Sequence, residues 1–287
     1  MKRLKAEYAD WIGERAKQSL LEEVYTTPKP GLVDLLTNGA HKDMDFHSFE
    51  QSASVLEPYF KKMAALGVEG TQEPEDLFLQ IRRVGIVAEC AMLRVTGGVN
   101  THKGAIFTIG ILCASAGRCY ARFGKVTIQD LIQMEQRMVR TTLLRELTVL
   151  RNQIPESNGC RNLIGYNSWG IRGEAIGGYR SVTEIALPIL ICGRKKESDW
   201  NLIKLQALLA LMSVVDDGNV LARRGKEGLE TVKLLAGKFL EEGGAYGHGA
   251  IKKLQDMDEL FTRENYSSGG CADLLAAGIF LIDLLGI

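Results

Sequence analysis

Residues 74–91 have the sequence PEDLFLQIRRVGIVAECA, which is the pattern of an amphipathic α-helix. Pro74 followed by two acidic residues is typical of a first helical turn, because proline needs no N–H donor there and acidic side chains favour the positive end of the helix dipole. Apolar residues then recur every three or four positions, at Leu77, Ile81, Val84, Val87, Ala88 and Ala91. This spacing places them on one face of a helix, which predicts that the face is buried.

The same periodicity extends over most of the 287 residues. Further helices are expected at about residues 4–24, 46–66, 104–120, 127–150, 181–192, 199–215, 226–241, 249–262 and 271–286. Strand-like alternation is nearly absent and no β-α-β rhythm is present, which argues against a Rossmann or P-loop architecture. The prediction is an all-α fold: a single-domain multi-helix bundle over residues 1–287, with glycine-rich, charged loops between helices forming the active site.

The composition excludes several classes of protein. The 35 Lys and Arg residues balance 35 Asp and Glu residues, which argues against a protein that coats nucleic acid or an anionic membrane. No apolar run approaches the ~18 uninterrupted residues of a membrane span, and the N-terminus has no apolar signal core. The six cysteines form no C-x-x-C pair and indicate free thiols in a reducing compartment. We therefore expect a cytoplasmic protein with neither nucleic acid nor membrane as partner.

Glycine is over-represented, at 31 of 287 residues against a usual ~7%. These glycines gather at the junctions between the expected helices. Helix C-caps and tight turns, where glycine tolerates positive φ, explain about half of them. Caps do not explain why the same junctions are crowded with ionisable and amide side chains, and this crowding makes the junctions the candidate functional site.

The first junction covers residues 26–45 and contains Lys29, Asp34, His41, Lys42 and Asp43. Two prolines impose an extended backbone that cannot continue the preceding helix, so a stiff loop is expected. The segment is either a solvated loop that ends in a helix N-cap or a pocket for polyphosphate and Mg²⁺. The residues of this segment alone favour neither interpretation.

The second junction, TGGVNTHKG at residues 96–104, directly precedes an apolar helix. Glycine-rich backbone at a helix N-terminus exposes N–H groups and the positive end of the helix dipole, which favours anion binding. Lys103 adds a charge, and Asn100 and Thr101 add hydrogen-bonding groups. The segment is not a Walker loop, because the required spacing and the preceding strand are both missing.

Three later junctions bring complementary groups. Arg172 and Glu174 are separated by one glycine, and the pair Asp216-Asp217 precedes Gly218 and Asn219. Adjacent carboxylates repel each other, so the pair needs a cation or donors nearby, although an N-cap beside a surface Asp is an equally good interpretation. Residues 267–273, SSGGCAD, form a second anion-friendly helix start or simply a well-capped helix.

Taken together, these segments resemble the triphosphoribosyl-dephospho-CoA synthase family over essentially the full length and in the family's order. The resemblance rests on six motifs: PKPGLVD at 28–34, GAHKDM at 39–44, GVNTHKG at 98–104, RGEA at 172–175, D-x-N-V at 217–220 with a following arginine, and N-x-S-x-GG-x-ADLL at 265–275. Several of these motifs are long enough to be individually specific.

The resemblance implies an all-α pentosyltransferase that joins ATP and 3′-dephospho-CoA, releasing adenine and giving 2′-(5″-triphosphoribosyl)-3′-dephospho-CoA. It further implies Mg²⁺, a carrier-protein transferase that uses the product, and a role in making the citrate lyase prosthetic group. The same reaction could serve malonate decarboxylase. An ATP-dependent phosphotransferase or hydrolase, or a non-catalytic helical interaction protein, are alternatives from other classes. A homodimer is possible, since the apolar helix at 274–285 suits either a core or a dimer contact.

The site roles expected from the resemblance follow from the reaction. Glu174 is the candidate general base, with Asp34 as its rival, and His102 and His41 are expected to contact phosphate or to polarise adenine. Metal or ribose contacts are expected of Asp43, Asp216 and Asp217. The remaining substrate-binding candidates are Lys29, Lys42, Lys103 and Arg172 for phosphate, Asn100 and Asn219 for sugar or base, and Gly98, Thr101, Arg223, Ser268, Gly269 and Gly270.

Overall fold

The computed structural model describes residues 2–152, 154–155, 157–196 and 199–286, and the all-α fold class is confirmed because no strand occurs among them. The α-helices are α1 (Lys2–Val24), α2 (Phe46–Glu69), α3 (Pro74–Val95), α4 (Lys103–Phe123), α5 (Ile128–Leu150), α6 (Asn158–Tyr166), α7 (Gly170–Gly177), α8 (Leu187–Lys195), α9 (Trp200–Val214), α10 (Gly218–Glu241), α11 (Ala250–Glu264) and α12 (Gly269–Leu285). A π-helix, η1 (Ser181–Ala186), precedes α8, and a 3₁₀ turn, η2 (Gly244–Tyr246), follows α10.

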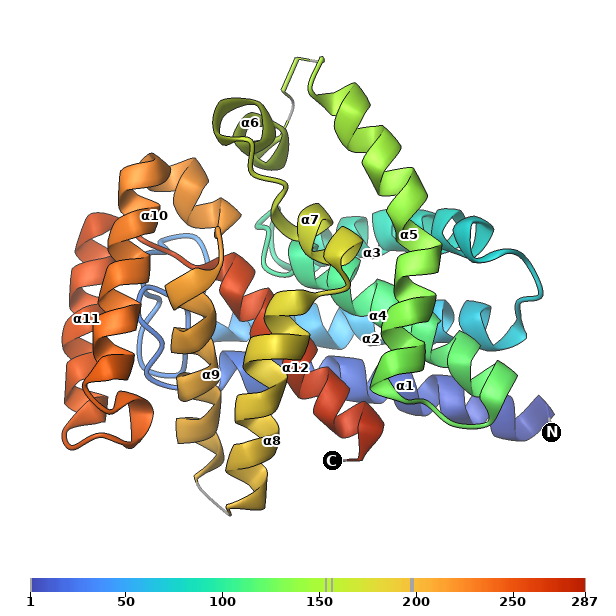
Figure 1. Ribbon diagram of the computed structural model, residues 1–287, viewed down its shortest axis with the longest axis horizontal. Coiled ribbons are helices and arrows are strands. Elements are labelled where there is room, and N and C mark those ends of the chain that lie inside the picture. Colours follow the sequence, from blue (N-terminus) through green and yellow to red (C-terminus); the bar gives the residue numbers. More distant parts are fainter. Residues whose placement is uncertain (1, 153, 156, 197–198, 287) are drawn as a thin grey trace.

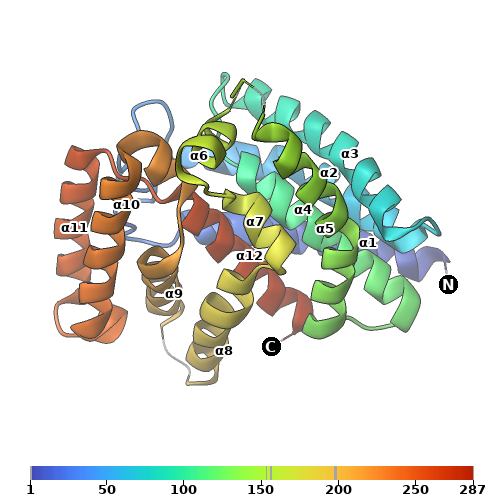
Figure 2. The ribbon, with the colours of Figure 1, turned by 45° about the horizontal axis from the view of Figure 1, so that its top comes forward.

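The last helix lies at the centre of the molecule. Figure 1 shows α12 crossing the middle, with α9, α10 and α11 on one side and α1 to α5 on the other, and Figure 2 shows the same division. α12 packs against α1, α4, α8, α9 and α10. Ten of the eleven residues from Leu274 to Leu284 are buried, so the apolar surface of α12 belongs to the core and offers nothing to a dimer contact.

The second central helix is α4, which packs against α1, α2, α3, α5 and α12. By length and composition α4 is the single helix of the described residues that could cross a membrane. The number of such segments rises to at most three, α4 included, if each of two bent helix pairs is counted as one. In this structure 72% of the apolar window of α4 is buried inside the protein. Its apolar side chains are therefore accounted for by packing against neighbouring helices.

The expected helix boundaries are right to within a few residues except in the glycine-rich segments. α6 and α7 were expected as a junction, and α10 begins at Gly218, eight residues before the expected start at 226, and bends at Gly225, where φ is 66°. Glycine disfavours helix by ~1 kcal/mol relative to alanine, so sequence pattern alone argues against helices here. Packing overrides this preference, because α7 buries Ala175 and Ile176 and contacts α5.

One buried carboxyl group stands out in the apolar core. Glu135 of α5 has no exposed surface, and neither of its side-chain oxygens has a hydrogen-bond partner within the described residues. Burial raises the pKa of Glu135 well above its usual value of 4.5, so the folded protein holds this group protonated. Burial raises the pKa of Tyr179 well above its usual value, and the Tyr179 hydroxyl lies close enough to Glu135 for the two groups to interact electrostatically.

Replacing Glu135 by Gln is expected to change how stability depends on pH. In the wild type the unfolded chain releases this proton above about pH 4.5 while the folded chain retains it, so the protonated group's contribution to stability is lost as pH rises. The E135Q protein lacks this loss. Urea unfolding at pH 5 and pH 8 should therefore show a smaller decline for E135Q than for the wild type. The exposed Glu230→Gln control should behave like the wild type. Equal declines for E135Q and the wild type would contradict the assignment.

Candidate active site

The loop between α1 and α2 is organised by the carboxylate of Asp34. One oxygen accepts the Lys29 N–H at 2.7 Å, and the other accepts the N–H groups of Leu36 and Thr37 at 2.7 and 3.0 Å. Asp34 is only 2% exposed. Three backbone donors and burial show that this carboxylate holds the loop in shape, which weakens its candidacy as general base against Glu174.

Lys29, expected on phosphate, has a partner inside the protein. Its Nζ donates to the Glu23 carbonyl at 2.9 Å and forms an ion pair with the Glu23 carboxylate. Both side chains are buried, and an ammonium group this far from water needs such a partner. Lys29 therefore fixes the position of Glu23 at the end of α1.

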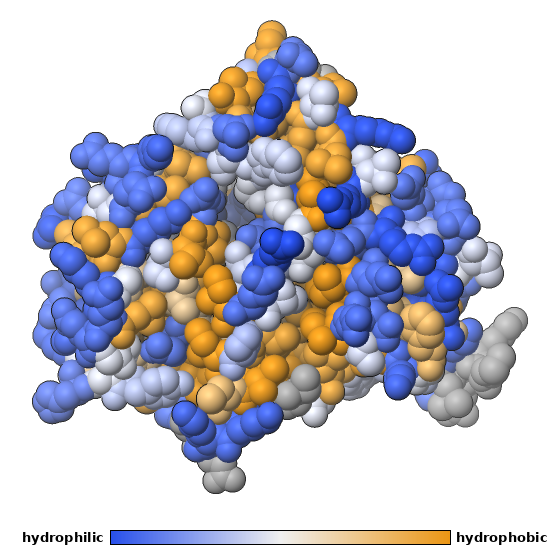
Figure 3. Space-filling model, viewed as in Figure 1, coloured by the Kyte–Doolittle hydropathy of each residue, from blue (hydrophilic) through white to orange (hydrophobic). Residues whose placement is uncertain are grey.

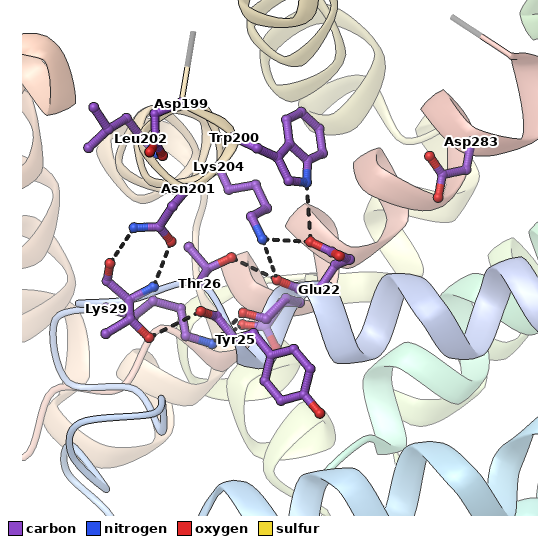
Figure 4. Close-up of polar contacts among 12 residues, drawn as sticks. Glu22, Tyr25, Thr26, Lys29, Asp199, Trp200, Asn201, Leu202, Lys204 and Asp283 are labelled. Carbon is purple, nitrogen blue, oxygen red and sulfur yellow. Dashed lines mark hydrogen bonds and ion pairs between the residues drawn. The ribbon is translucent and has the colours of Figure 1, made fainter.

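The same end of α1 is anchored to α9. Figure 4 shows Lys204 and Trp200 converging on Glu22, with the Lys204 ammonium 2.7 Å and the Trp200 indole 3.1 Å from the carboxylate. Asn201 accepts the Thr27 N–H at 2.9 Å beside them. The loop is thus held both by its own carboxylate and by a neighbouring helix.

His102, at the start of α4, is a buried neutral imidazole. Its Nδ1 lies 2.7 Å from the Ser52 hydroxyl, which accepts the Thr101 hydroxyl at 2.8 Å. Burial, helped by the charge of Lys29, lowers the pKa of His102 to about 3. With Ser52 donating to Nδ1, the inferred tautomer carries its proton on Nε2, which has no partner in the described part of the chain. The ring can therefore donate one hydrogen bond without being a cation.

Asp217 joins the starts of two helices. One oxygen accepts the N–H groups of Asn219 and Val220 at 2.8 and 3.2 Å, and the other accepts the Cys271 N–H at 2.8 Å. A Cβ at position 270 would lie 2.9 Å from this carboxylate, so Gly270 is required for the approach. The N-cap interpretation of Asp217 is confirmed, and the cap serves α10 and α12 together.

Asp273 lies in the first turns of α12, where the sequence suggested either an anion-friendly helix start or a well-capped helix, but its carboxylate points to the start of α4. Its carboxylate accepts the Ala105 N–H, and a Cβ at position 104 would lie 2.0 Å from its Oδ2. Gly104 therefore makes room for Asp273, and Asp273 occupies an N–H group that the sequence suggested was open to an anion. Burial, then the charges of Glu23 and Asp217, raises the pKa of Asp273 well above its usual range.

A second polar group surrounds Arg223 of α10. Its guanidinium donates to the Ala40 carbonyl and the Asn265 side chain at 3.0 and 2.8 Å, and it lies 3.2 Å from His41 Nδ1. The other ring nitrogen of His41 lies 2.8 Å from the Ser267 hydroxyl. Burial, then the charge of Arg223, lowers the pKa of His41 to about 4, so this imidazole is neutral as well. Motifs separated by more than 180 residues in the chain meet here.

Glu174 lies on α7, within electrostatic reach of Cys271 at the start of α12. Its carboxylate accepts the Ser181 hydroxyl at 2.6 Å and the Ser181 N–H at 3.3 Å. The charges of Asp217 and Glu174 both contribute, after burial, to raising the pKa of Cys271. Glu174 is only half-buried, so unlike Asp34 it combines proximity to the helix junction with access to a ligand.

We use the name junction cluster for Glu23, Lys29, His102, Glu174, Asp217 and Asp273. Glu23 and Lys29 form an ion pair, and Lys29 adds to the effect of burial in lowering the pKa of His102. After burial, the charges of Glu23 and Asp217 raise the pKa of Asp273, and the charges of Asp217 and Glu174 raise the pKa of Cys271. Near it the surface is hollowed between α10 and the α6–α7 segment, as Figure 3 shows. Asn219 and Gly269 lie beside it, since a Cβ at position 269 would come within 2.5 Å of the Asn219 amide.

Other predicted residues lie outside the junction cluster, several of them at the surface. Lys103 forms an ion pair with Glu89 of α3, and Lys42, Gly98 and Asn100 are exposed. Arg172 lies beside Gly159 at the start of α6, Thr101 bonds Ser52, and the buried Ser268 hydroxyl has no partner among the described residues.

The predicted magnesium ligands do not form a metal site. Asp216 is exposed and pairs with Lys233 at 2.5 Å, Asp217 is saturated by backbone donors, and Asp43 is largely exposed beside His41. Across the described residues, no group of three or more His, Cys, Asp or Glu side chains is placed to hold a metal ion. Adjacent positions 216 and 217 point to different surroundings, so the three aspartates do not meet at one point, and their contacts with metal or ribose stay a prediction.

Sequence reasoning missed four polar residues of this region. Glu23 and Ser52 lie within amphipathic helices, where they are indistinguishable from solvent-facing residues, and Ser267 was treated only as part of a loop. Asp258 of α11 is also missed, although it accepts the Gly31 N–H at 2.8 Å and the Thr37 hydroxyl at 2.9 Å. For Glu23, the one available signal is its place directly before the proline loop.

Comparison with known proteins identifies relatives along the whole chain. A family model described as ATP:dephospho-CoA triphosphoribosyl transferase matches residues 9–286. A 2-(5″-triphosphoribosyl)-3′-dephosphocoenzyme-A synthase from Escherichia fergusonii is 38% identical over 274 residues, covering 95% of this chain and 90% of that protein. Its counterpart from Klebsiella pneumoniae is 37% identical over 282 residues, covering 98% and 93%.

A solved structure shares the fold. It is a protein from Archaeoglobus fulgidus assigned as a triphosphoribosyl-dephospho-CoA synthase, with a TM-score of 0.54 and 21% sequence identity. The match covers 84% of this chain and 99% of that chain. At this identity the likeness bears on the fold alone.

The adjacent residues Asp216 and Asp217 give a matched test of the two-helix cap. Asp217→Ala removes an N-cap, which costs about 1 kcal/mol of folding stability. It also leaves the buried Cys271 N–H without an acceptor, which costs about 1–3 kcal/mol more. We expect it to lower the free energy of unfolding by about 2–4 kcal/mol in urea titrations without ligand. Asp216→Ala removes only an exposed ion pair and should cost less than about 1 kcal/mol. Equal losses for the two variants would refute the cap.

Proposed function

The chain belongs to the ATP:dephospho-CoA triphosphoribosyl transferase family, and from this premise we propose that the junction cluster is where it joins its two substrates. The enzyme is a pentosyltransferase that transfers the triphosphoribosyl group of ATP to dephospho-CoA. The observation that supports this location is the meeting of Glu23, His102, Glu174, Asp217 and Asp273 from five separate segments of the chain. Ionisable groups with perturbed pKa values gather preferentially at functional sites, which favours this junction as the place of bond exchange.

The reaction exchanges one bond at the ribose of ATP. The 2′-hydroxyl oxygen of dephospho-CoA bonds to C1′ of that ribose, and the bond from C1′ to the adenine nitrogen breaks. The hydroxyl proton goes to a base, adenine leaves with the bonding electron pair and takes up a proton, and the triphosphate stays on the product. Positive charge develops on the ribose during the exchange, so carboxylates near C1′ stabilise the transition state.

Glu174 is proposed as the group that takes the hydroxyl proton. Its half-buried carboxylate accepts the Ser181 hydroxyl, which orients it, and it has lone pairs left for a substrate. Asp34 is less suited to the role, because three backbone N–H groups already occupy its oxygens inside the loop.

Departure of adenine is assigned to His102 and Asp273. The Nε2–H of neutral His102 and the carboxyl group of Asp273, whose raised pKa favours its protonated form, are donors in a largely water-free setting. A donor to an adenine nitrogen stabilises the electron pair that the base carries away. Ser52 holds the His102 ring in the tautomer that this requires.

The triphosphate is proposed to lie along basic side chains near the surface, with Lys42, Arg172 and Arg223 as its contacts, while Lys103 faces the phosphates of dephospho-CoA. His41 and Asn219, with the backbone of Gly269 and Gly270, complete this side. Lys29 acts on phosphate only indirectly, through the loop and through Glu23. Magnesium enters the proposal only as the ion that the triphosphate carries, and no step is assigned to it.

The cellular setting is also part of the proposal. The product is the precursor of the acyl-carrier prosthetic group of citrate lyase, or of malonate decarboxylase, and is passed to a carrier-protein transferase. The six cysteines are all free, which suits a reducing cytoplasm. A homodimer remains a proposal without support from α12.

Incubation with ATP, Mg²⁺ and dephospho-CoA tests the function directly. Mass analysis should find free adenine and a coupled product that retains all three phosphates of ATP, in equal amounts. ADP or inorganic phosphate in place of adenine would instead identify a phosphotransferase or hydrolase, since phosphoryl transfer leaves the glycosidic bond intact. Omitting dephospho-CoA should abolish adenine release.

Glu174→Gln tests the base. The amide keeps the shape but takes up no proton, so turnover should fall by about 10²–10⁴-fold while ATP binding, measured by calorimetry, stays within about twofold of the wild type. Glu184→Gln, on the adjacent η1 helix and exposed, should retain wild-type turnover. An E174Q enzyme with near-normal turnover would transfer the base role elsewhere.

A further inference from the structure

A groove lies between α3 and α4, on the side of Lys103 away from the junction cluster. Facing residues of the two helices form its walls, among them Phe78 and Ile86 of α3 and Phe107 and Ile111 of α4, with Met63 of α2 behind them. Its volume is about 170 Å³. The helices run antiparallel, since the ion pair between Lys103 and Glu89 joins the start of α4 to the last turns of α3. One end of the groove therefore opens at the predicted substrate motif.

Gly85 keeps this groove open. It lies in the middle of α3, where glycine costs about 1 kcal/mol of helix stability relative to alanine. A Cβ at position 85 would have no neighbour closer than 3.7 Å, to the Met63 methyl group, so close packing does not require glycine here. A larger side chain at this position would project into the groove, because Gly85 is one of its lining residues.

The size and lining of the groove select one kind of occupant. Pockets that enclose drug-sized ligands measure about 300–1,000 Å³, so about 170 Å³ suits a slim chain better than an adenosine. The walls are mostly apolar, which excludes a triphosphate. Charge is confined to Lys103, Glu89 and Arg82, and Lys103 at the motif end complements a phosphate group from which such a chain would extend.

The length also fits. From Lys103 to Ile111 the groove follows α4 over eight residue-to-residue steps, or about 12 Å at ~1.5 Å per step. The pantetheine arm of dephospho-CoA is a chain of roughly twelve atoms. An extended polypeptide spans ~3.3–3.6 Å for every three backbone atoms, so an extended arm is ~14 Å long. Its methyl and methylene groups would contact the apolar walls, and its two amides would face the open side toward water.

We propose that this groove binds the pantetheine arm of dephospho-CoA, with the adenosine end directed past Lys103 toward the junction cluster. The inference rests on the proposed function and deepens it, because it assigns recognition of the acceptor to a surface distinct from the site of bond exchange. The enzyme then distinguishes dephospho-CoA from ADP, which is the same molecule without the arm, by contacts along α3 and α4.

The test fills the groove from Gly85. Initial rates of adenine release are measured for the wild type, Gly85→Ala and Gly85→Leu, with dephospho-CoA varied at saturating ATP and ATP varied at saturating dephospho-CoA. ADP serves as a competitive inhibitor that lacks the arm. For G85L we expect kcat/KM for dephospho-CoA to fall at least tenfold. The KM for ATP and the inhibition constant of ADP should stay within twofold. G85A should lie between G85L and the wild type, and its small side chain meets only ordinary contacts, so it tests the groove even if G85L folds poorly.

Gly237→Leu is the matched control. Gly237 is also a helical glycine with open space around it, on α10, so the same side chain is added away from the groove. Its kinetics should equal those of the wild type. An active wild type whose Gly85 variants use dephospho-CoA normally, or lose ATP and ADP binding in parallel, would overturn the groove assignment alone. A wild type that makes no coupled product would overturn the proposed function as well.

Discussion

The arrangement of the centre depends on the carboxylate of Asp217, which accepts backbone N–H groups from the starts of both α10 and α12. α12 is almost wholly apolar, and hydrophobic packing by itself is non-directional, so it does not define how far the helix slides along its neighbours. A hydrogen bond of 2.8 Å to Cys271 does define it. This hydrogen bond fixes the position of the first turn of α12 relative to the first turn of α10. Side chains at the start of either helix are therefore positioned by the Asp217 carboxylate.

Two further contacts transmit this position to the other half of the molecule. Asp273, one turn along α12, receives the Ala105 N–H of α4, and it approaches so closely that only glycine fits at position 104. The charge of Glu23, held by Lys29, reaches Asp273 from α1. Three helices from distant parts of the chain therefore meet through polar contacts around one point. Burying several carboxylates together is unfavourable unless donors or protons compensate, and the structure provides backbone N–H groups, one ammonium group and a raised pKa.

Much of this could be predicted from the sequence, because helical periodicity is local. The helix at residues 74–91 reappears with Leu77, Ile81, Ala88 and Ala91 buried, although Val87 of the predicted face is exposed. The proline break after α1 also reappears, as does the N-cap expected at the end of residues 26–45, which is Asp45 in a capping box with Ser48. α6 and α7 could not be predicted, since their glycines disfavour helix locally and only packing supports them. The junctions were correctly chosen as places where ionisable residues converge. The partners of individual side chains were not predicted, because they depend on tertiary position. Asp216 and Asp217 are chemically identical neighbours in the chain, yet they have different surroundings.

The distribution of charge explains how a neutral chain can still bind a highly charged nucleotide. Basic groups that remain accessible, such as Lys42 and Lys103, lie toward the surface, whereas the acidic groups of the junction cluster are buried or half-buried. A ligand with phosphates at one end and a ribose at the other would meet positive charge first and carboxylates at the sugar. This order suits glycosyl transfer, in which the phosphates are spectators and positive charge develops on the ribose. A phosphoryl-transfer enzyme needs the opposite, with its cations gathered around the reacting phosphate.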